Sequence, residues 1–412
     1  MNVITLTKAL IACPSVTPET AGAFDVIEQF LAPLGFVVHR VTFEGDGGPP
    51  TENLYARYGT TGRNFCFAGH TDVVPPGDIA TWKVPPFVPE IIDGELYGRG
   101  AEDMKGAIAA FMVAAKEFLH SPLEGESKSA QRDSVRGNTA ATPPHGSQAL
   151  TRSPSREELR GCSISLLITQ DEEGSAINGT RKMLDWLAAR GERLDACVVG
   201  EPTNPDRLGE MMKVGRRGSA YFTLTVEGKQ GHVAYPDRAD NPITRLVNML
   251  HALKAEPIDA GTEFFPPSNL EITTVDVGNA TGNVIPARAR AEINVRFNSL
   301  HTGETIAQWV RAKLDPLGAH TLQVRVTGES FITRDEALIE VVRSAVETVT
   351  GERPTLSTTG GTSDARFIKD VCPVVEFGTT GRTPHMVNER VEVAVLESLA
   401  RVYGEVLKQF FA

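Results

Sequence analysis

The feature that most constrains this fold is a series of short apolar runs of strand type, each followed closely by a histidine or a carboxylate. Segments with helical periodicity separate several of the runs. Strands that alternate with helices typically form an open α/β sheet, which binds its ligands at the carboxyl ends of the strands. We therefore expect an α/β protein with a site at one sheet edge. The runs and the residues that follow them are 64–69 with His70, 162–169 with Glu172 and Glu173, and 196–199 with Glu201.

The first run ends in an arrangement typical of a metal ligand. Asp72 stands two positions after His70, so both side chains point to the same side of a strand. A histidine that binds a metal usually donates its other ring N–H to an oxygen such as a carboxylate, which fixes the orientation of the ring. Taken alone, the pattern is also that of an ordinary surface histidine. The acidic groups downstream favour the metal ligand.

A second candidate ligand, Asp103, stands where a helix is expected to begin. Gly100 and Gly106 flank it, and apolar residues then recur at helical spacing from 108 to 119. An aspartate at such a position often only caps the helix. A carboxylate held at a helix N-terminus is also suited to bridge two cations, and glycine allows the backbone to approach closely.

Three consecutive carboxylates at 171–173 and a late histidine, His385, complete the set of candidates. The carboxylates repel one another unless they share a cation or a proton, although a charged surface turn would have the same sequence. His385 by itself would be an ordinary loop histidine. Together the candidates supply two imidazoles, at least three carboxylates and no thiolate, which suits two divalent ions such as Zn²⁺, Mn²⁺ or Co²⁺. A carboxylate left free of the metals could act as a general base.

The chain is expected to contain two domains and one insertion. Residues 121–160 contain no aromatic residue and few large apolar residues, which predicts a disordered surface insertion. Residues 215–328 follow the β-α-β-β-α-β order of a ferredoxin-like unit. This unit is expected to interrupt a catalytic domain formed by residues 1–214 and 329–412.

The net charge and the apolar pattern limit the expected partners. The formal net charge is −11, which disfavours nucleic acid and anionic membranes because both require a basic surface. No apolar run approaches the roughly 18 residues that a membrane-spanning helix needs. The five cysteines form no Cys-x-x-Cys pair. We expect a cytoplasmic protein without a nucleic-acid or membrane partner.

Five motifs resemble those of the co-catalytic di-zinc peptidase and deacylase family, which includes acetylornithine deacetylases, glutamate carboxypeptidases and aminoacylases. Four further segments resemble the desuccinylase branch of that family. The resemblance covers nearly the whole chain except 121–160. The family motifs are GHTD at 69–72, GAEDMKG at 100–106, DEEG at 171–174, GEPT at 200–203 and the late His385. The desuccinylase-like segments are GRRGS at 215–219, GHVAYP at 231–236, GNVIP at 282–286 and GGTSDARF at 360–367.

The resemblance implies a fold, an assembly and a reaction. The catalytic domain would have a mixed, mostly parallel sheet with helices on both faces. The inserted ferredoxin-like domain would act as a lid and form a homodimer. The reaction would be hydrolysis of N-succinyl-LL-2,6-diaminopimelate to LL-2,6-diaminopimelate and succinate, for lysine biosynthesis. An acetylornithine deacetylase or another di-zinc amide hydrolase of the family is the alternative, and a metal-binding protein without turnover is a third interpretation.

The resemblance also implies a metal-binding role for five residues. His70 and Glu201 would hold one zinc, Glu173 and His385 would hold the other, and Asp103 would bridge them. Co²⁺ or Mn²⁺ could substitute for zinc. The peptide bond after Asp103 would be cis.

The implied catalytic residues are Asp72, which would orient His70, Glu172 as the general base, and His232, which would stabilise the oxyanion from the partner subunit. The implied substrate carries several carboxylates, and arginine binds carboxylates through two parallel hydrogen bonds. For Arg217 and Arg296, structural ion pairs are the alternative to substrate binding. Desuccinylases often carry an asparagine or another substrate-contacting group near Gly381, and its absence here leaves that substrate contact unassigned. The implied substrate-binding residues are Arg216, Arg217, Tyr235, Asn283, Arg296, Gly361, Thr362 and Ser363.

Overall fold

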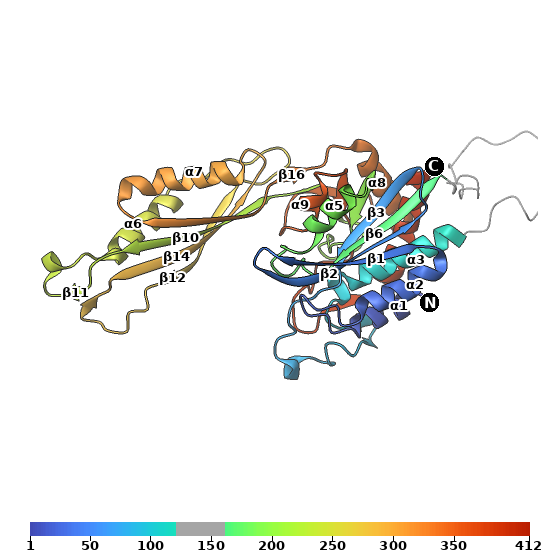
Figure 1. Ribbon diagram of the computed structural model, residues 1–412, viewed down its shortest axis with the longest axis horizontal. Helices are drawn as coiled ribbons and strands as arrows, with labels where there is room; N and C mark the ends of the chain where they lie inside the picture. The colour runs from blue at the N-terminus through green and yellow to red at the C-terminus, as the bar shows by residue number, and fades with distance from the viewer. Residues whose placement is uncertain (121–160) are drawn as a thin grey trace, which may run out of the picture. The chain divides into compact units, whose positions relative to one another are not determined.

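The computed structural model describes residues 1–120 and 161–412, and the insertion expected at 121–160 lies outside them. The chain divides into two compact units (Figure 1). The first unit contains Met1–Met212, Arg334–Thr355 and Asp370–Ala412, and the second contains Lys213–Thr333 and Leu356–Lys369.

An eight-stranded mixed sheet forms the centre of the first unit. Its strands, in spatial order, are β1 (Val37–Gly45), β2 (Gly48–Tyr58), β6 (Cys162–Thr169), β3 (Arg63–His70), β7 (Ala196–Val199), β18 (Val374–Glu376), β8 (Met211–Lys213) and β17 (Thr355–Ser357). β6, β3, β7 and β18 run parallel, whereas β2 is antiparallel to β1 and to β6. Every residue of β6 and β7 is buried, as expected for parallel strands covered on both faces. The predicted fold class is therefore confirmed.

Aromatic side chains join this sheet to two helices. The ring of Phe67, on β3, stacks on that of Phe111 with 4.6 Å between the centroids, and Tyr403 meets both rings edge-on. Such pairs contribute about 0.5–1.5 kcal/mol each beyond the burial of their area. Phe111 belongs to α3 (Gly106–His120) and Tyr403 to α10 (Val393–Phe411). The other helices of the unit are α1 (Val3–Ile11), α2 (Ala23–Leu31), α5 (Thr180–Ala188) and α8 (Glu336–Thr350), with short 3-10 turns at Ala32–Leu34 and Ile79–Thr81.

Two smaller features of the first unit lie close to the predicted site. The irregular turn Ala101–Lys105 precedes α3 and contains a cis peptide bond between Asp103 and Met104, which confirms that expectation. A small antiparallel sheet combines β19 (Arg390–Glu392), β5 (Glu95–Tyr97) and β4 (Glu90–Ile92).

The second unit is built on a four-stranded antiparallel sheet in the order β12-β14-β10-β15. Along β10 the residues Phe222, Leu224 and Val226 are fully buried, and they share one core with residues of the two helices of this unit, α6 and α7. Side chains two positions apart lie on the same face of a strand, so the two helices cover one face of the sheet (Figure 1). In chain order the elements are β10 (Gly218–Glu227), α6 (Pro242–Lys254), β12 (Asn269–Asp276), β14 (Arg288–Phe297), α7 (Gly303–Leu314) and β15 (Thr321–Gly328). This is the predicted ferredoxin-like order.

Several short elements complete the second unit. They are β9 (Gly215–Arg216) paired with β16 (Phe331–Ile332), β11 (Gly231–His232) paired with β13 (Val284–Ile285), helix α9 (Ala365–Ile368), and 3-10 turns at Pro236–Arg238 and Asp315–Leu317. Among the helices of residues 1–120 and 161–412, none combines the length and the apolar character needed to cross a bilayer.

The segment Leu356–Lys369 groups with the second unit, which differs from the prediction that all of 329–412 belongs to the catalytic domain. Polar contacts explain this difference. Lys213 Nζ donates to Ser357 Oγ at 3.2 Å and to Thr359 Oγ1 at 3.0 Å, and Arg216 Nη1 donates to Thr359 O at 3.2 Å. Thr358 Oγ1 donates to Phe264 O at 2.5 Å. These contacts join residues that are far apart in the chain, which local sequence patterns do not reveal.

Replacing Phe111 by Ala is expected to destabilise the first unit by about 3–5 kcal/mol, because a buried aromatic ring is removed from a closely packed core. The midpoint of urea unfolding, followed by tryptophan fluorescence, measures the loss. Ile79→Ala is the control, since Ile79 is 60% exposed and its truncation should change stability by less than about 0.5 kcal/mol. Equal effects of the two substitutions would contradict the packing described for Phe111.

Candidate metal centre

His70 ends β3 in the middle of the parallel strands, opposite Thr169 of β6, and its side chain is buried. Its Nδ1 lies 2.8 Å from the backbone oxygen of Asp72. Because a carbonyl oxygen only accepts, Nδ1 carries the proton, and the neutral ring then presents a lone pair at Nε2. This Nε2 lies 3.2 Å from Asp103 Oδ1 and 3.7 Å from Glu201 Oε1. Burial opposes a charge on His70, yet Asp103, Asp72 and Glu201 raise its pKa well above the ordinary value. The site therefore attracts positive charge.

Asp103 lies between the two imidazoles, as the bridging role requires. Its Oδ1 faces His70 and its Oδ2 lies 3.4 Å from Nε2 of His385. Burial alone would raise the pKa of this carboxyl, but hydrogen bonds and charge from the two histidines hold it well below its usual range. When His70 is neutral, its Nε2 has no proton to donate, and the buried Oδ1 then has no hydrogen-bond partner. An ionised carboxylate with an unpaired oxygen in a buried position fits a cation ligand.

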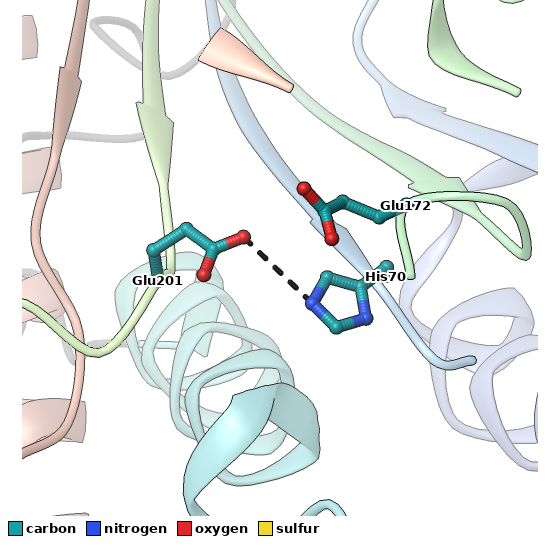
Figure 2. Close-up of side chains that lie close together, drawn as sticks. All are labelled: His70, Glu172 and Glu201. Atoms are coloured by element: carbon teal, nitrogen blue, oxygen red, sulfur yellow. Dashed lines mark ion pairs between the residues drawn. The ribbon is translucent and has the colours of Figure 1, made fainter. Parts of the chain in front are cut away.

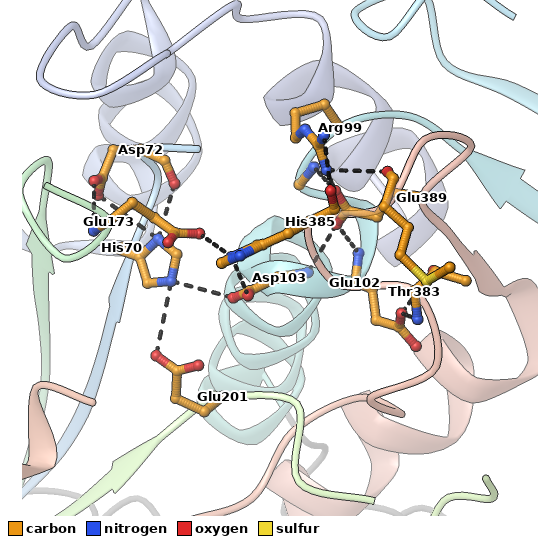
Figure 3. A network of polar contacts seen from close by, with 12 residues as sticks. His70, Asp72, Arg99, Glu102, Asp103, Glu173, Glu201, Thr383, His385 and Glu389 are labelled. Carbon is orange, nitrogen blue, oxygen red and sulfur yellow. Dashed lines mark hydrogen bonds and ion pairs between the residues drawn. The ribbon is translucent and has the colours of Figure 1, made fainter. Parts of the chain in front are cut away.

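His385 approaches from a loop of the C-terminal part of the chain. Its backbone has a φ of 61°, the left-handed region that a non-glycine residue seldom adopts. Its half-exposed side chain places Nε2 2.8 Å from Glu173 Oε1. Hydrogen bonds that the His385 ring donates to Asp103 and Glu173 raise its pKa to about 10. His385, Glu173 and Asp103 therefore meet at one point, as predicted for one metal site (Figure 3).

Glu201 and Glu172 follow β7 and β6, the two strands that flank β3 in the sheet. Together with His70 they offer three ligand atoms that all lie within 4.8 Å of one another (Figure 2). Burial and the charges of Asp103 and Glu172 raise the pKa of Glu201 well above its ordinary value. Glu172 was predicted as the general base, and its position is compatible with a metal ligand as well.

The residues brought together fit divalent cations by their chemistry. Four carboxylates converge on two imidazoles, and carboxylate oxygen with imidazole nitrogen is a typical donor set for Zn²⁺, Mn²⁺ and Co²⁺. A second group of three ligand atoms within 4.8 Å is formed by His70, Asp103 and Glu173. The two groups share His70 and together contain every predicted ligand of the first unit except His385, which lies against Glu173 and Asp103.

Asp72 was predicted to orient His70 through its carboxylate, and the structure gives the side chain a different set of contacts. The backbone oxygen of Asp72 makes the close contact to His70, while its Oδ1 lies 3.6 Å from the ring. The carboxylate accepts from the N–H of Glu173 at 3.0 Å and of Glu172 at 3.5 Å. Burial raises the pKa of Asp72 to about 7. Asp72 thus anchors the loop that carries Glu172 and Glu173.

His232 belongs to the second unit, where it lies exposed on β11. Its Nδ1 accepts a hydrogen bond from the backbone N–H of Ala234 at 3.0 Å. In the neutral ring the proton therefore sits on Nε2, which can donate to a substrate. The exposed ring of Tyr235 lies 5.7 Å from that of His232 between centroids.

The other predicted substrate-binding residues also lie in the second unit. Arg217 donates to Asn269 Oδ1 at 2.7 Å, and burial together with the charge of Arg296 lowers its pKa. Arg296 donates to Asn294 Oδ1 at 3.0 Å. Two arginines that repel each other in a half-buried place are suited to bind an anion. The remaining contacts are Asn283 O with Val233 N, Thr362 Oγ1 with Arg366, Ser363 Oγ with Ala365 N, and Arg216 Nη1 with Thr359 O. Gly361 lies in the segment Leu356–Lys369.

Arg99, Glu102 and Glu389 are buried charged residues beside the centre that the sequence analysis did not identify as functional. They form hydrogen bonds with the backbone around Asp103 and His385 (Figure 3). Glu102 lies within a family motif and Glu389 follows His385 by four residues. The one sequence feature that could have indicated a role for Glu102 and Glu389 is that they stand near the predicted ligands Asp103 and His385.

Comparison with known proteins places both units in one family. Residues 66–127 match the model of peptidase family M20/M25/M40, and residues 214–321 match that of the peptidase dimerisation domain. The succinyl-diaminopimelate desuccinylase of Rhodospirillum centenum is 53% identical over 410 residues, which cover 99% of this chain and 97% of the relative. That of Methylorubrum populi is 50% identical over 414 residues, which cover 99% and 98%.

Solved structures share the fold at low sequence identity. An M20 family metallo-carboxypeptidase from Sulfolobus solfataricus has a TM-score of 0.75 at 15% identity, with 100% of this chain and 99% of that chain covered. A Bacillus subtilis protein described as a dinuclear metal-binding peptidase of the M20 family has a TM-score of 0.66 at 14% identity, with 98% and 96% covered.

Proposed function

Because this chain belongs to peptidase family M20/M25/M40 and, within it, to the succinyl-diaminopimelate desuccinylases, we propose that it hydrolyses N-succinyl-LL-2,6-diaminopimelate. The products are LL-2,6-diaminopimelate and succinate, in the biosynthesis of diaminopimelate and lysine. The observation that carries the proposal is the similarity over nearly the whole chain, which includes the second unit and its predicted substrate-binding residues. No observation favours acetylornithine deacetylation.

The cluster of the first unit is proposed to hold two divalent cations, with zinc as the physiological ion and Co²⁺ or Mn²⁺ as substitutes. His70 and Glu201 would hold one ion, Glu173 and His385 the other, and Asp103 would contact both. The convergence of these groups and the unpaired Oδ1 of Asp103 support the assignment. When bound, the cations would supply Lewis acidity toward the amide carbonyl and lower the pKa of the attacking water.

Glu172 is proposed to move the proton. Its carboxylate takes a proton from the attacking water as the water oxygen bonds to the carbonyl carbon. It then gives this proton to the amide nitrogen as the carbon–nitrogen bond breaks, so that the amine leaves neutral. The hydrogen bonds of Asp72 to the backbone of Glu172 and Glu173 support this role, because they hold the proposed base in place.

His232 is proposed to stabilise the oxyanion in the active site of the other copy of a cytoplasmic homodimer formed through the second unit. The match to the dimerisation domain supports the homodimer. The hydrogen bond from Ala234 to Nδ1 supports the role of His232, because it leaves the Nε2 proton free to donate. Arg216, Arg217 and Arg296 are proposed to bind the carboxylates of the substrate.

The substrate assignment predicts that metal-loaded protein hydrolyses N-succinyl-LL-2,6-diaminopimelate and leaves N-acetylornithine largely intact. A primary-amine assay measures both reactions, and protein treated with a chelator is the control. Turnover of the acetyl compound alone would contradict the substrate while leaving the metal chemistry in place.

Glu172→Gln is expected to keep both metal ions and to lower kcat by about 10²–10⁴-fold, because the amide side chain cannot accept the proton. Elemental analysis of the dialysed protein measures the metal content alongside kcat. Loss of a metal ion from the variant would show that Glu172 is a ligand.

His232→Ala is expected to lower kcat by about 10²–10³-fold with unchanged metal content, because one donor to the oxyanion is removed. Co-expression of His232→Ala with Glu172→Gln tests whether the residue acts across the dimer. A mixed dimer should regain part of the activity, since one of its two sites then combines an intact Glu172 with an intact His232. Mixed dimers without activity would contradict a role in the other copy.

A further inference from the structure

Two buried glutamates that are not proposed ligands connect the backbone segments that carry Asp103 and His385. Glu102 and Glu389 are 0% and 1% exposed. Each is near a proposed ligand in sequence, yet each directs its carboxylate to the segment that carries the other ligand (Figure 3).

Glu102 binds the segment that leads to His385. Its Oε1 accepts from Thr380 Oγ1 at 2.5 Å and from the N–H of Arg382 at 3.1 Å. Its Oε2 accepts from the N–H and the hydroxyl of Thr383 at 2.5 and 2.7 Å. The backbone oxygen of Glu102 also accepts from Thr379 Oγ1 at 2.7 Å.

Glu389 makes the reciprocal contacts with the segment that carries Asp103. Its Oε1 accepts from the N–H of Glu102 at 3.0 Å and of Asp103 at 3.1 Å. Its Oε2 accepts from the N–H of Gly100 at 2.9 Å and from Arg99 Nη1 at 2.8 Å. Arg99 in turn donates to the backbone oxygen of His385 at 3.4 Å.

We infer that Glu102 and Glu389 are positioning residues that set the distance between Asp103 and His385 and thereby the affinity of the metal site formed with Glu173. The inference rests on the ligand assignment in the proposed function. Residues that orient metal ligands are normally hydrogen-bonded groups of this kind, and a site is effective only when such groups hold its ligands in place.

The backbone near His385 explains why this metal site needs such support. His385 and Asn388 have φ values of 61° and 62°, and non-glycine residues stay in this region only when surrounding contacts hold them there. The ligands His70 and Glu201 follow strands β3 and β7, whose ladder extends to a bond from Gly200 N to Ala68 O at 3.1 Å. Their positions do not depend on the two glutamates.

The test is a titration of Co²⁺ into metal-free full-length protein, followed by calorimetry and by the visible absorption of the bound ion. Glu102→Gln and Glu389→Gln are expected to weaken one of the two binding steps by roughly 10–100-fold and the other step much less, because the two ions share only Asp103. A glutamine presents a donor to groups that are themselves donors, so each substitution breaks part of the network. Glu397→Gln, at an exposed position on α10, is the matched control and should change neither step.

The double variant Glu102→Gln/Glu389→Gln should weaken that step by less than the product of the single effects, because both glutamates fix the same distance.

If either variant fails to fold by circular dichroism, Thr383→Val decides, since it removes one donor to Glu102 and keeps the backbone bond. It should weaken the same step more than the other. Equal weakening of both steps, or no change in a folded variant, would overturn the inference. Binding is measured without substrate, so a failure of the proposed reaction would appear separately, as wild-type protein that binds two ions without turnover.

Discussion

Repulsion among partly buried carboxylates is the constraint on which the rest of this structure depends. Asp103, Glu172, Glu173 and Glu201 meet around His70 and His385 at one sheet edge. Charges so close together in a poorly hydrated place are unfavourable unless positive charge offsets them. The carboxylates also raise the pKa values of both histidines, so the site favours positive charge. Two divalent cations would satisfy it and would also provide the chemistry of amide hydrolysis.

The fold places some of the proposed ligands at the ends of sheet strands and the others on irregular segments. His70, Glu172, Glu173 and Glu201 follow three adjacent parallel strands, β3, β6 and β7, whose register brings them to the same edge. Asp103 and His385 come instead from irregular segments. Their positions depend on reciprocal hydrogen bonds of buried side chains, which the ladder of a sheet does not supply.

Local patterns in the sequence were sufficient for much of this arrangement. Apolar runs that end in acidic residues predicted the α/β sheet and its functional edge, and the β-α-β-β-α-β order predicted the second sheet. The resemblance of short motifs supplied the proposed metal-binding residues and the cis bond after Asp103. The contacts of Glu102 with the segment before His385 could not be predicted, because the bonded residues Glu102 and Arg382 are 280 positions apart. The same holds for the segment Leu356–Lys369, whose partners Lys213 and Arg216 stand far away in the chain. For Asp72, the spacing alone did not distinguish its backbone oxygen from its carboxylate as the partner of His70.

The most direct test of the central claim is a crystal structure of zinc-loaded protein with anomalous data collected on both sides of the zinc absorption edge. Two zinc peaks about 3.5–4 Å apart are expected. Asp103 should lie between them, with His70 and Glu201 at one peak and Glu173 and His385 at the other. A single peak, or zinc bound away from these residues, would contradict the proposal that the carboxylate cluster exists to hold two cations.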